Sequence, residues 1–265
     1  TPEIYTLSLH DALPISLPEG ISTPAIDWGS YAGKRRHLPW FLLAARLLAN
    51  NGLPVFMHGD TGESADRLYT QNALAALDMP VAQSFSEAQE HLAASHFAYL
   101  PLTAFAPGIK RLMQLRDLLG LRSPVHSVAR MLNPLSAPLS VHGIFHRGYE
   151  HIHQRAACLL NEPSVLVFKG EGGEAEINPE MATELFISRA QAVEQTPWQP
   201  LLERRQIKPE QLDPAHLRAV WHGDCNDSYG EAAVVSTLAA VLSALGRVGS
   251  QEDAVALAKT WWDAR

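Results

Sequence analysis

The sequence predicts an α/β fold in which a mostly parallel or mixed central sheet is flanked by helices. Short runs of aliphatic, β-branched and aromatic residues alternate with longer stretches whose apolar residues recur at helical spacing. This alternation is typical of strands joined by helices that cover one sheet. A chain of 265 residues with 46% hydrophobic and 18% charged residues also has the composition of a globular domain, not of a disordered protein.

Each element follows from a local pattern. Strands are predicted where short apolar runs are bounded by turn residues, at 53–57, 97–100, 140–145, 165–168 and 184–187. Helices are expected between them at 38–49, 66–77 and 107–120, and again over 214–265, where Ser250 starts the last one.

The segment 107–120 has the clearest helical pattern. Pro107 suits a first turn and Gly120 suits an end. The predicted buried face consists of Ile109, Leu112, Met113 and Leu119. The opposite face is polar and basic.

Domain organisation is simple. Residues 1–16 resemble a translated sequencing adapter, so we exclude them from the fold and expect the native N-terminal segment to be missing. No Ser/Gly linker, charge block or repeat interrupts residues 17–265, which we predict to form one α/β domain with a helical C-terminal part.

Bulk properties limit the function classes. The formal net charge of −7 argues against a wholesale polycation but allows a local basic groove. Cys158 and Cys225 cannot form a disulfide framework, and we expect both to be buried apolar side chains and not nucleophiles. The longest apolar run, 38–49, contains Arg46 and is too short to span a bilayer. We therefore expect a soluble, cytoplasmic protein without membrane partners.

A polar loop follows the first predicted strand. Because parallel strands place ligands at their carboxyl ends, this loop predicts a phosphate or nucleotide site. Its candidate residues are His58, Gly59, Asp60 and Ser64. We expect His58 itself to be a hydrogen-bonded structural residue.

Several ordered motifs carry a family resemblance. They are Met57-His58-Gly59-Asp60-Thr61, Ser64-Ala65-Asp66, Ala106-Pro107-Gly108-Ile109-Lys110, Leu119-Gly120-Leu121-Arg122, Asn133-Pro134, Val141-His142-Gly143-Ile144 and Val167-Phe168-Lys169-Gly170. Together they resemble the glycosyltransferase family that contains anthranilate phosphoribosyltransferase and the pyrimidine-nucleoside phosphorylases, nearest its divergent YbiB-type branch. The resemblance covers roughly residues 20 to 265. It implies a phosphoribosyltransferase-type α/β domain whose N-terminal helical subdomain, through which members form dimers, is largely missing. A homodimer is therefore implied for the full-length protein, and the oligomeric state of this chain is left open.

Departures from the family pattern imply impaired catalysis. The glycine-rich loop that wraps pyrophosphate in the catalytic branch corresponds to residues 26–36, where Asp27, Gly29, Ser30 and Gly33 remain as candidate substrate-loop residues. The family's Mg²⁺-binding Asp-Glu pair falls on Ala175 and Glu176, which leaves Glu176 as a weak metal candidate. We therefore expect no catalytic residues and no cofactor.

Basic residues gather in two segments. The first holds Lys34, Arg35 and Arg36; the second holds Lys110, Arg111, Arg116, Arg122 and Arg130. The resemblance to the YbiB-type branch implies sequence-nonspecific DNA or RNA binding through such residues. The alternative is a phosphoribosyltransferase acting on an aromatic amine, with Mg²⁺ near Glu176 and Arg116 orienting the acceptor. A third hypothesis is a regulatory protein that binds a nucleotide. His142, His146, His151 and His153 do not predict a zinc site.

Overall fold

The computed structural model describes residues 22–62, 64–115, 118, 120, 124–209 and 211–265. Its seven-stranded sheet has the order β3-β2-β1-β4-β5-β6-β7. Strands β1 to β5 are parallel, and β6 and β7 continue the sheet antiparallel to them. The strands are β1 Ile26–Ser30, β2 Val55–Gly59, β3 Phe97–Pro101, β4 Leu139–Ile144, β5 Ser164–Lys169, β6 Thr183–Arg189 and β7 Ala192–Trp198.

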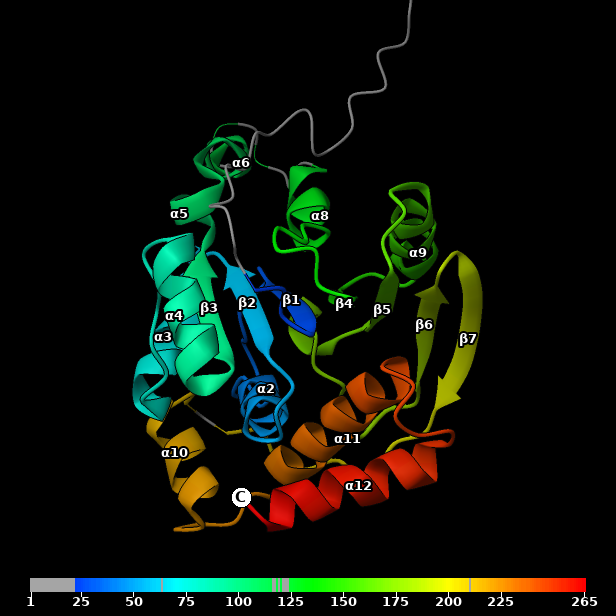
Figure 1. Cartoon of the computed structure of the whole chain (residues 1–265). Coiled ribbons are helices and arrows are strands. Elements are labelled where there is room, and N and C mark those ends of the chain that lie inside the picture. The colour runs from blue at the N-terminus through cyan, green and yellow to red at the C-terminus, as the bar shows by residue number, and fades with distance from the viewer. Residues whose placement is uncertain (1–21, 63, 116–117, 119, 121–123, 210) are drawn as a thin grey trace, which may run out of the picture.

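Helices cover both faces of the sheet; α11 and α12 lie on one side and α8 and α9 on the other (Figure 1). The helices are α2 Phe41–Asn50, α3 Thr70–Leu74, α4 Phe85–Ser95, α5 Leu102–Phe105, α6 Pro107–Gln114, α8 Val125–Arg130, α9 Tyr149–Leu159, α10 Ala215–His222, α11 Ser228–Ala244 and α12 Gln251–Asp263, with 3₁₀ turns η1 Ala75–Leu77 and η2 Glu171–Gly173. The predicted fold class is confirmed.

Three core clusters pack against the sheet, and they follow the alternation of side chains along the strands. In β2, Val55 and Met57 belong to the large core with α2 and α11, whereas Phe56 belongs to the core formed with α4 and α5. Strands buried on both faces read as continuous apolar runs, which is why the sequence revealed β2 to β6.

Two strands were missed. The segment predicted to be part of a phosphate loop, Ile26–Ser30, is the fully buried central strand β1. Strand β7 escaped because its residues are mostly polar and exposed at the sheet edge.

The helix predicted over 107–120 is shorter than expected. Helix α6 ends at Gln114, and the region beyond it includes residues outside the described part of the chain. Ile109 and Met113 are buried as predicted, but Leu112 is 45% exposed, so the predicted apolar face is wrong at that position.

The strand order places a topological switch point at β1. The chain runs from β1 to β2 and β3 on one side and returns to β4 on the other. In open α/β sheets ligands bind outside the carboxyl ends of two adjacent strands whose connections run in opposite directions. The loops after β1 and β4 therefore define the place for a site. Within the described residues, no helix is long and apolar enough to cross a membrane.

Candidate functional site

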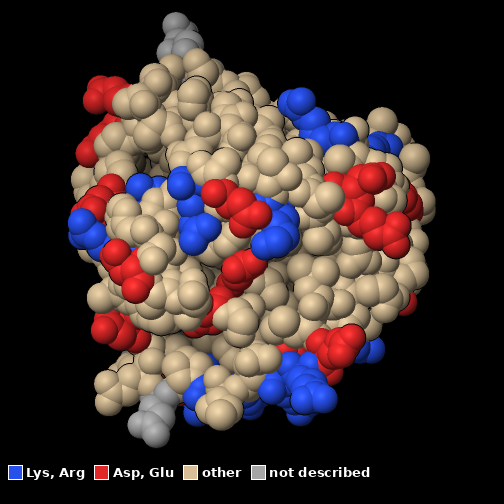
Figure 2. Space-filling view, turned by 90° about the horizontal axis from the view of Figure 1, so that it is seen from below, with Lys and Arg blue, Asp and Glu red and all other residues tan. Residues whose placement is uncertain are grey.

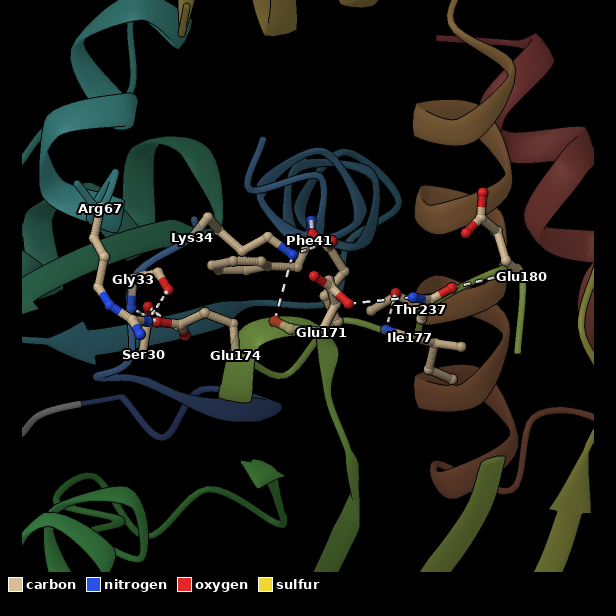
Figure 3. A network of polar contacts seen from close by, with 12 residues as sticks. Ser30, Gly33, Lys34, Phe41, Arg67, Glu171, Glu174, Ile177, Glu180 and Thr237 are labelled. Carbon is tan, nitrogen blue, oxygen red and sulfur yellow. Dashed lines mark hydrogen bonds and ion pairs between the residues drawn. The ribbon is translucent and has the colours of Figure 1, made fainter. Parts of the chain in front are cut away.

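The loop after β1 forms an anion cradle that a carboxylate of the same chain fills. Glu174 accepts hydrogen bonds from Ser30 Oγ at 2.8 Å, from the Ala32 amide at 2.7 Å and from the Gly33 amide at 2.5 Å. Its side chain comes from the loop after β5 and is buried (Figure 3). Consecutive backbone N–H groups aimed at one point make an anion-binding concavity, and the anion in this one is the Glu174 carboxylate.

Neighbouring groups hold the cradle loop in place. The Thr70 hydroxyl lies 2.6 Å from Ser30 Oγ. Thr70 is the donor in this pair, because the Ser30 hydroxyl already donates its proton to Glu174. Arg67 donates to the carbonyl oxygens of Ala32 and Gly33 at 3.0 and 3.2 Å. Gly33 has a φ of +68°, a backbone conformation that favours glycine. The loop is thus braced from both its amide and its carbonyl side.

Two glycines let the backbone of Glu174 come close to the sheet. A Cβ at Gly143, in β4, would lie 2.3 Å from the carbonyl carbon of Glu174 and from the Ala175 amide nitrogen. A Cβ at Gly170 would also collide with the Glu174 carbonyl oxygen. The His142-Gly143 and Lys169-Gly170 motifs therefore position the carboxylate.

A buried ion pair lies beside the cradle. Lys34 Nζ is 2.5 Å from Glu176 Oε1, and Glu176 Oε2 accepts a hydrogen bond from the Phe41 amide at 2.8 Å. Burial raises the pKa of Glu176 to about 7, while the ammonium of Lys34 and the Phe41 N–H act in the opposite direction. Lys34 is 1% exposed. The structure therefore places Lys34, predicted to contact a polyanion, in an ion pair inside the protein.

Glu176 does not present a metal ligand here. Both carboxylate oxygens are engaged, one by an ammonium and one by a backbone amide. Across the described ranges, no group of three or more His, Cys, Asp or Glu residues is placed to hold a metal ion. The weak expectation of Mg²⁺ at Glu176 does not fit these contacts.

His58 forms part of a second buried network. Its Nε2 lies 3.0 Å from Asp27 Oδ1, and its Nδ1 lies 2.6 Å from the Tyr31 hydroxyl. An imidazole protonated at Nε2 satisfies both contacts, donating to Asp27 and accepting from Tyr31. Burial raises the pKa values of Asp27 and Tyr31. The predicted structural, hydrogen-bonded role of His58 is confirmed; the network joins β1 to β2.

The remaining candidates of the substrate loop lie around β1 and β2. Gly29 is inside β1, and Gly59 pairs with Ser30 so closely that a Cβ would lie 2.2 Å from the Ser30 carbonyl oxygen. Asp60 pairs with Lys110 of α6 at 2.6 Å, and Ser64 is half-buried. Lys110 is only 15% exposed, so its charge is also largely neutralised within the protein.

The other basic candidates do not share one environment. Arg35 is exposed and pairs with Asp66 at 2.8 Å. Arg36 and Arg111 are exposed, whereas Arg130 is buried and donates to the His126 carbonyl oxygen at 2.9 Å. Arg116 and Arg122 lie outside the described residues. Figure 2 shows the lower side of the view in Figure 1, opposite α6 and α8, and on that face basic and acidic side chains are interspersed.

Sequence reasoning missed a surface beside the cradle, which we call the α9 rim. A Cβ at Gly173 would lie 3.2 Å from Phe145 Cβ and 3.4 Å from Ala32 Cβ, so the loop after β4 adjoins the loop after β1. The α9 rim consists of Phe145, His146, Arg147, Tyr149, Arg155 and Lys169, all exposed. The acid within this run, Glu150, is buried and accepts from the Gly148 amide at 2.5 Å. The aromatic and basic residues of 145–149 were the available signal.

Comparisons with known proteins agree with this architecture. The sequence profile described as the glycosyl transferase family, a/b domain, matches residues 41–263. YbiB of Escherichia coli strain K12 is 24% identical over 68% of this chain and 56% of its own length. The anthranilate phosphoribosyltransferase of Burkholderia multivorans is 26% identical over 78% of this chain and 62% of its own length. The chain thus spans only about half to three-fifths of the length of these curated relatives.

Solved structures show the same fold. The anthranilate phosphoribosyltransferase of Thermus thermophilus superposes with a TM-score of 0.73 at 23% identity, covering 90% of this chain and 73% of that one. The enzyme of Saccharomyces cerevisiae, in complex with PRPP and Mg, gives a TM-score of 0.75 at 14% identity, with 97% and 73% coverage. Because the profile matches most of the chain, the protein belongs to this glycosyl transferase family through its α/β domain.

Proposed function

We propose that this protein is a catalytically impaired member of its family that binds single-stranded DNA or RNA at the α9 rim. The observation that carries the proposal is the carboxylate of Glu174 in the anion cradle. With the cradle filled by Glu174, the α9 rim supplies exposed aromatic and basic side chains beside it.

The filled cradle disfavours a phosphosugar substrate. A pyrophosphate would need the two amides and the hydroxyl that Glu174 already occupies, and it would meet a like charge there. A divalent cation could offset that repulsion, but Glu176 is committed to Lys34 and Phe41. The residues present at this position therefore fit neither the anion nor the metal of the transfer reaction.

The α9 rim has the chemistry that single-stranded nucleic acid requires. Phe145 and Tyr149 are 51% and 46% exposed, and the ring of His146 lies between them, 4.8 Å from Phe145 and 6.4 Å from Tyr149. Exposed rings stack on bases without regard to sequence, while neighbouring cations contact the backbone phosphates. Arg147, in the loop after β4, and Lys169, at the end of β5, supply those cations.

A titration with a fluorescent oligothymidylate, the matching RNA homopolymer and a duplex tests the proposal. We expect binding at low salt that favours the single strands and weakens as salt rises. Arg147→Ala with Lys169→Ala should reduce the logarithmic salt slope by about 0.7 per lost phosphate contact. Tyr149→Ala should weaken binding by about 1–3 kcal/mol.

The matched control is Arg204→Ala with Arg205→Ala, which removes the same charge from exposed positions elsewhere. An equal loss in this control would show that only net charge matters, and absence of binding at low salt would remove the proposal altogether.

The second candidate is a phosphoribosyltransferase. It is favoured by the relatives and structural neighbours named anthranilate phosphoribosyltransferase, and by a cradle whose three donors are all still present. Incubation of the wild type and of Glu174→Ala with PRPP, anthranilate and Mg²⁺ tests it. Turnover by the wild type would overturn the proposal that catalysis is impaired. Turnover by the variant alone would show that the Glu174 side chain prevents catalysis.

A further inference from the structure

A cysteine, a histidine and an aspartate line up at the junction of α10 and α11, away from the anion cradle. Cys225 lies in the turn between the end of α10 at His222 and the cap of α11 at Asp227. The sequence predicted a buried, inert side chain, but Cys225 is half-buried. Part of the residue reaches the surface, and the rest packs against the hydrophobic core.

The contacts connect the three side chains in series. Cys225 Sγ lies 3.7 Å from His216 Nδ1, and His216 Nε2 lies 2.9 Å from Asp227 Oδ2. The other Asp227 oxygen accepts from the Gly230 amide at 2.7 Å, which fixes the carboxylate on the first turn of α11. A nucleophile, a base and a group that orients the base stand in this order in enzymes with activated thiols.

A cavity of about 330 Å³ adjoins this series. His216 and Asp227 are part of its wall, together with His37, Trp40 and Tyr229. The Tyr229 side chain is 4% exposed, and its hydroxyl has no hydrogen-bond partner among the described residues. Its ring stacks on His37 with centroids 3.8 Å apart. The wall of the cavity is therefore partly aromatic, and the Tyr229 hydroxyl behind it is buried.

We propose that Cys225, which contacts the cavity-lining His216 but is not itself part of the cavity wall, is a reactive thiol that forms a mixed disulfide with small disulfides. His216 takes the thiol proton, and the resulting thiolate attacks one sulfur of the incoming disulfide. The Cys225–sulfur bond forms while the disulfide bond of the reagent breaks. The departing thiolate receives the proton from His216, so no further oxidant or reductant is needed.

The second cysteine of the chain, Cys158, provides an internal control for the reactivity of Cys225. Cys158, on α9, is also half-buried. If His216 and Asp227 only tie α10 to α11, the two thiols should react at similar rates. A selective reaction at Cys225 requires the base.

The test uses the folded full chain and 5,5′-dithiobis(2-nitrobenzoate), an aromatic disulfide. Cys158→Ser should release thionitrobenzoate about tenfold faster than Cys225→Ser. Adding His216→Gln to Cys158→Ser should remove that advantage, whereas His222→Gln, at an exposed position, should leave it intact.

Mass spectrometry of the unmodified protein, quenched early, provides a measurement that needs no variant. It should find the mixed disulfide at Cys225 before Cys158. Equal labelling of the two cysteines, or an unchanged rate in a folded His216→Gln protein, would overturn the proposal.

Discussion

Replacing Glu174 by alanine should convert the cradle into an open anion site. The substitution removes an acceptor of three hydrogen bonds, from Ser30 Oγ and from the amides of Ala32 and Gly33. Each bond to a charged acceptor contributes about 1.5–3 kcal/mol, so losing all three would cost about 5–9 kcal/mol. Water entering the vacated space offsets part of that loss, and we expect the free energy of unfolding to fall by about 3–5 kcal/mol.

The same change should create an affinity that the wild type lacks. A ligand at 100 times its dissociation constant stabilises the folded state by about 2.7 kcal/mol. For a domain of this size, that raises the melting temperature by about 5–10 °C. Differential scanning fluorimetry with and without pyrophosphate measures the effect, and Glu203→Ala, at an exposed position, is the control.

The reasoning is refuted if pyrophosphate stabilises the wild type as much as Glu174→Ala. It is equally refuted if a folded Glu174→Ala protein gains nothing from pyrophosphate. In either case the carboxylate would not be standing where an anion binds.

Three further outcomes follow from the buried groups. Lys34→Ala should lower the free energy of unfolding by about 3–5 kcal/mol, since it strands a buried carboxylate, whereas Arg36→Ala should change it by less than about 0.5 kcal/mol in a urea titration. Gly143→Ala should push a methyl group into the backbone that carries the cradle carboxylate, and we expect a loss of about 3 kcal/mol, the upper end of the usual cost of overpacking, by the same measurement. Burial lowers the pKa of His153 from 6.5 to about 4, so the unfolded chain binds a proton in this window that the folded chain does not. Stability should therefore fall by about 3 kcal/mol as the pH drops from 6.5 to 4. His153→Gln should flatten this pH profile, unlike the exposed His222→Gln; an unchanged profile would contradict the assignment.

The sequence predicted those parts of the fold whose pattern is local. Strands β2 to β6 are apolar runs bounded by turn residues, and the cap of the last helix is Ser250, as expected. Strand β1 was missed because Asp27, Gly29 and Ser30 have the composition of a loop. Its buried aspartate is tolerated because His58, on the neighbouring strand, is its partner.

The candidate site was harder to predict because its contacts join distant segments. Glu174 meets amides that lie 141 and 142 residues earlier, and Lys34 meets Glu176 across 142 residues. The run of basic residues in the sequence therefore did not indicate that Lys34 forms a buried ion pair while Arg36 is exposed to solvent. The α9 rim could have been predicted from the sequence, since aromatic and basic residues occur together over 145–149. It was missed because these residues match no known ligand-binding motif.

A substrate-binding loop is normally ordered by its ligand, because backbone amides that are buried without an acceptor are energetically costly. Here the chain supplies the acceptor itself, the Glu174 carboxylate from the loop after β5, whose backbone comes close because Gly143 and Gly170 have no side chain. The amides of the loop therefore have an acceptor without any bound small molecule. Substitutions on the surface around the loop then leave its hydrogen bonds intact.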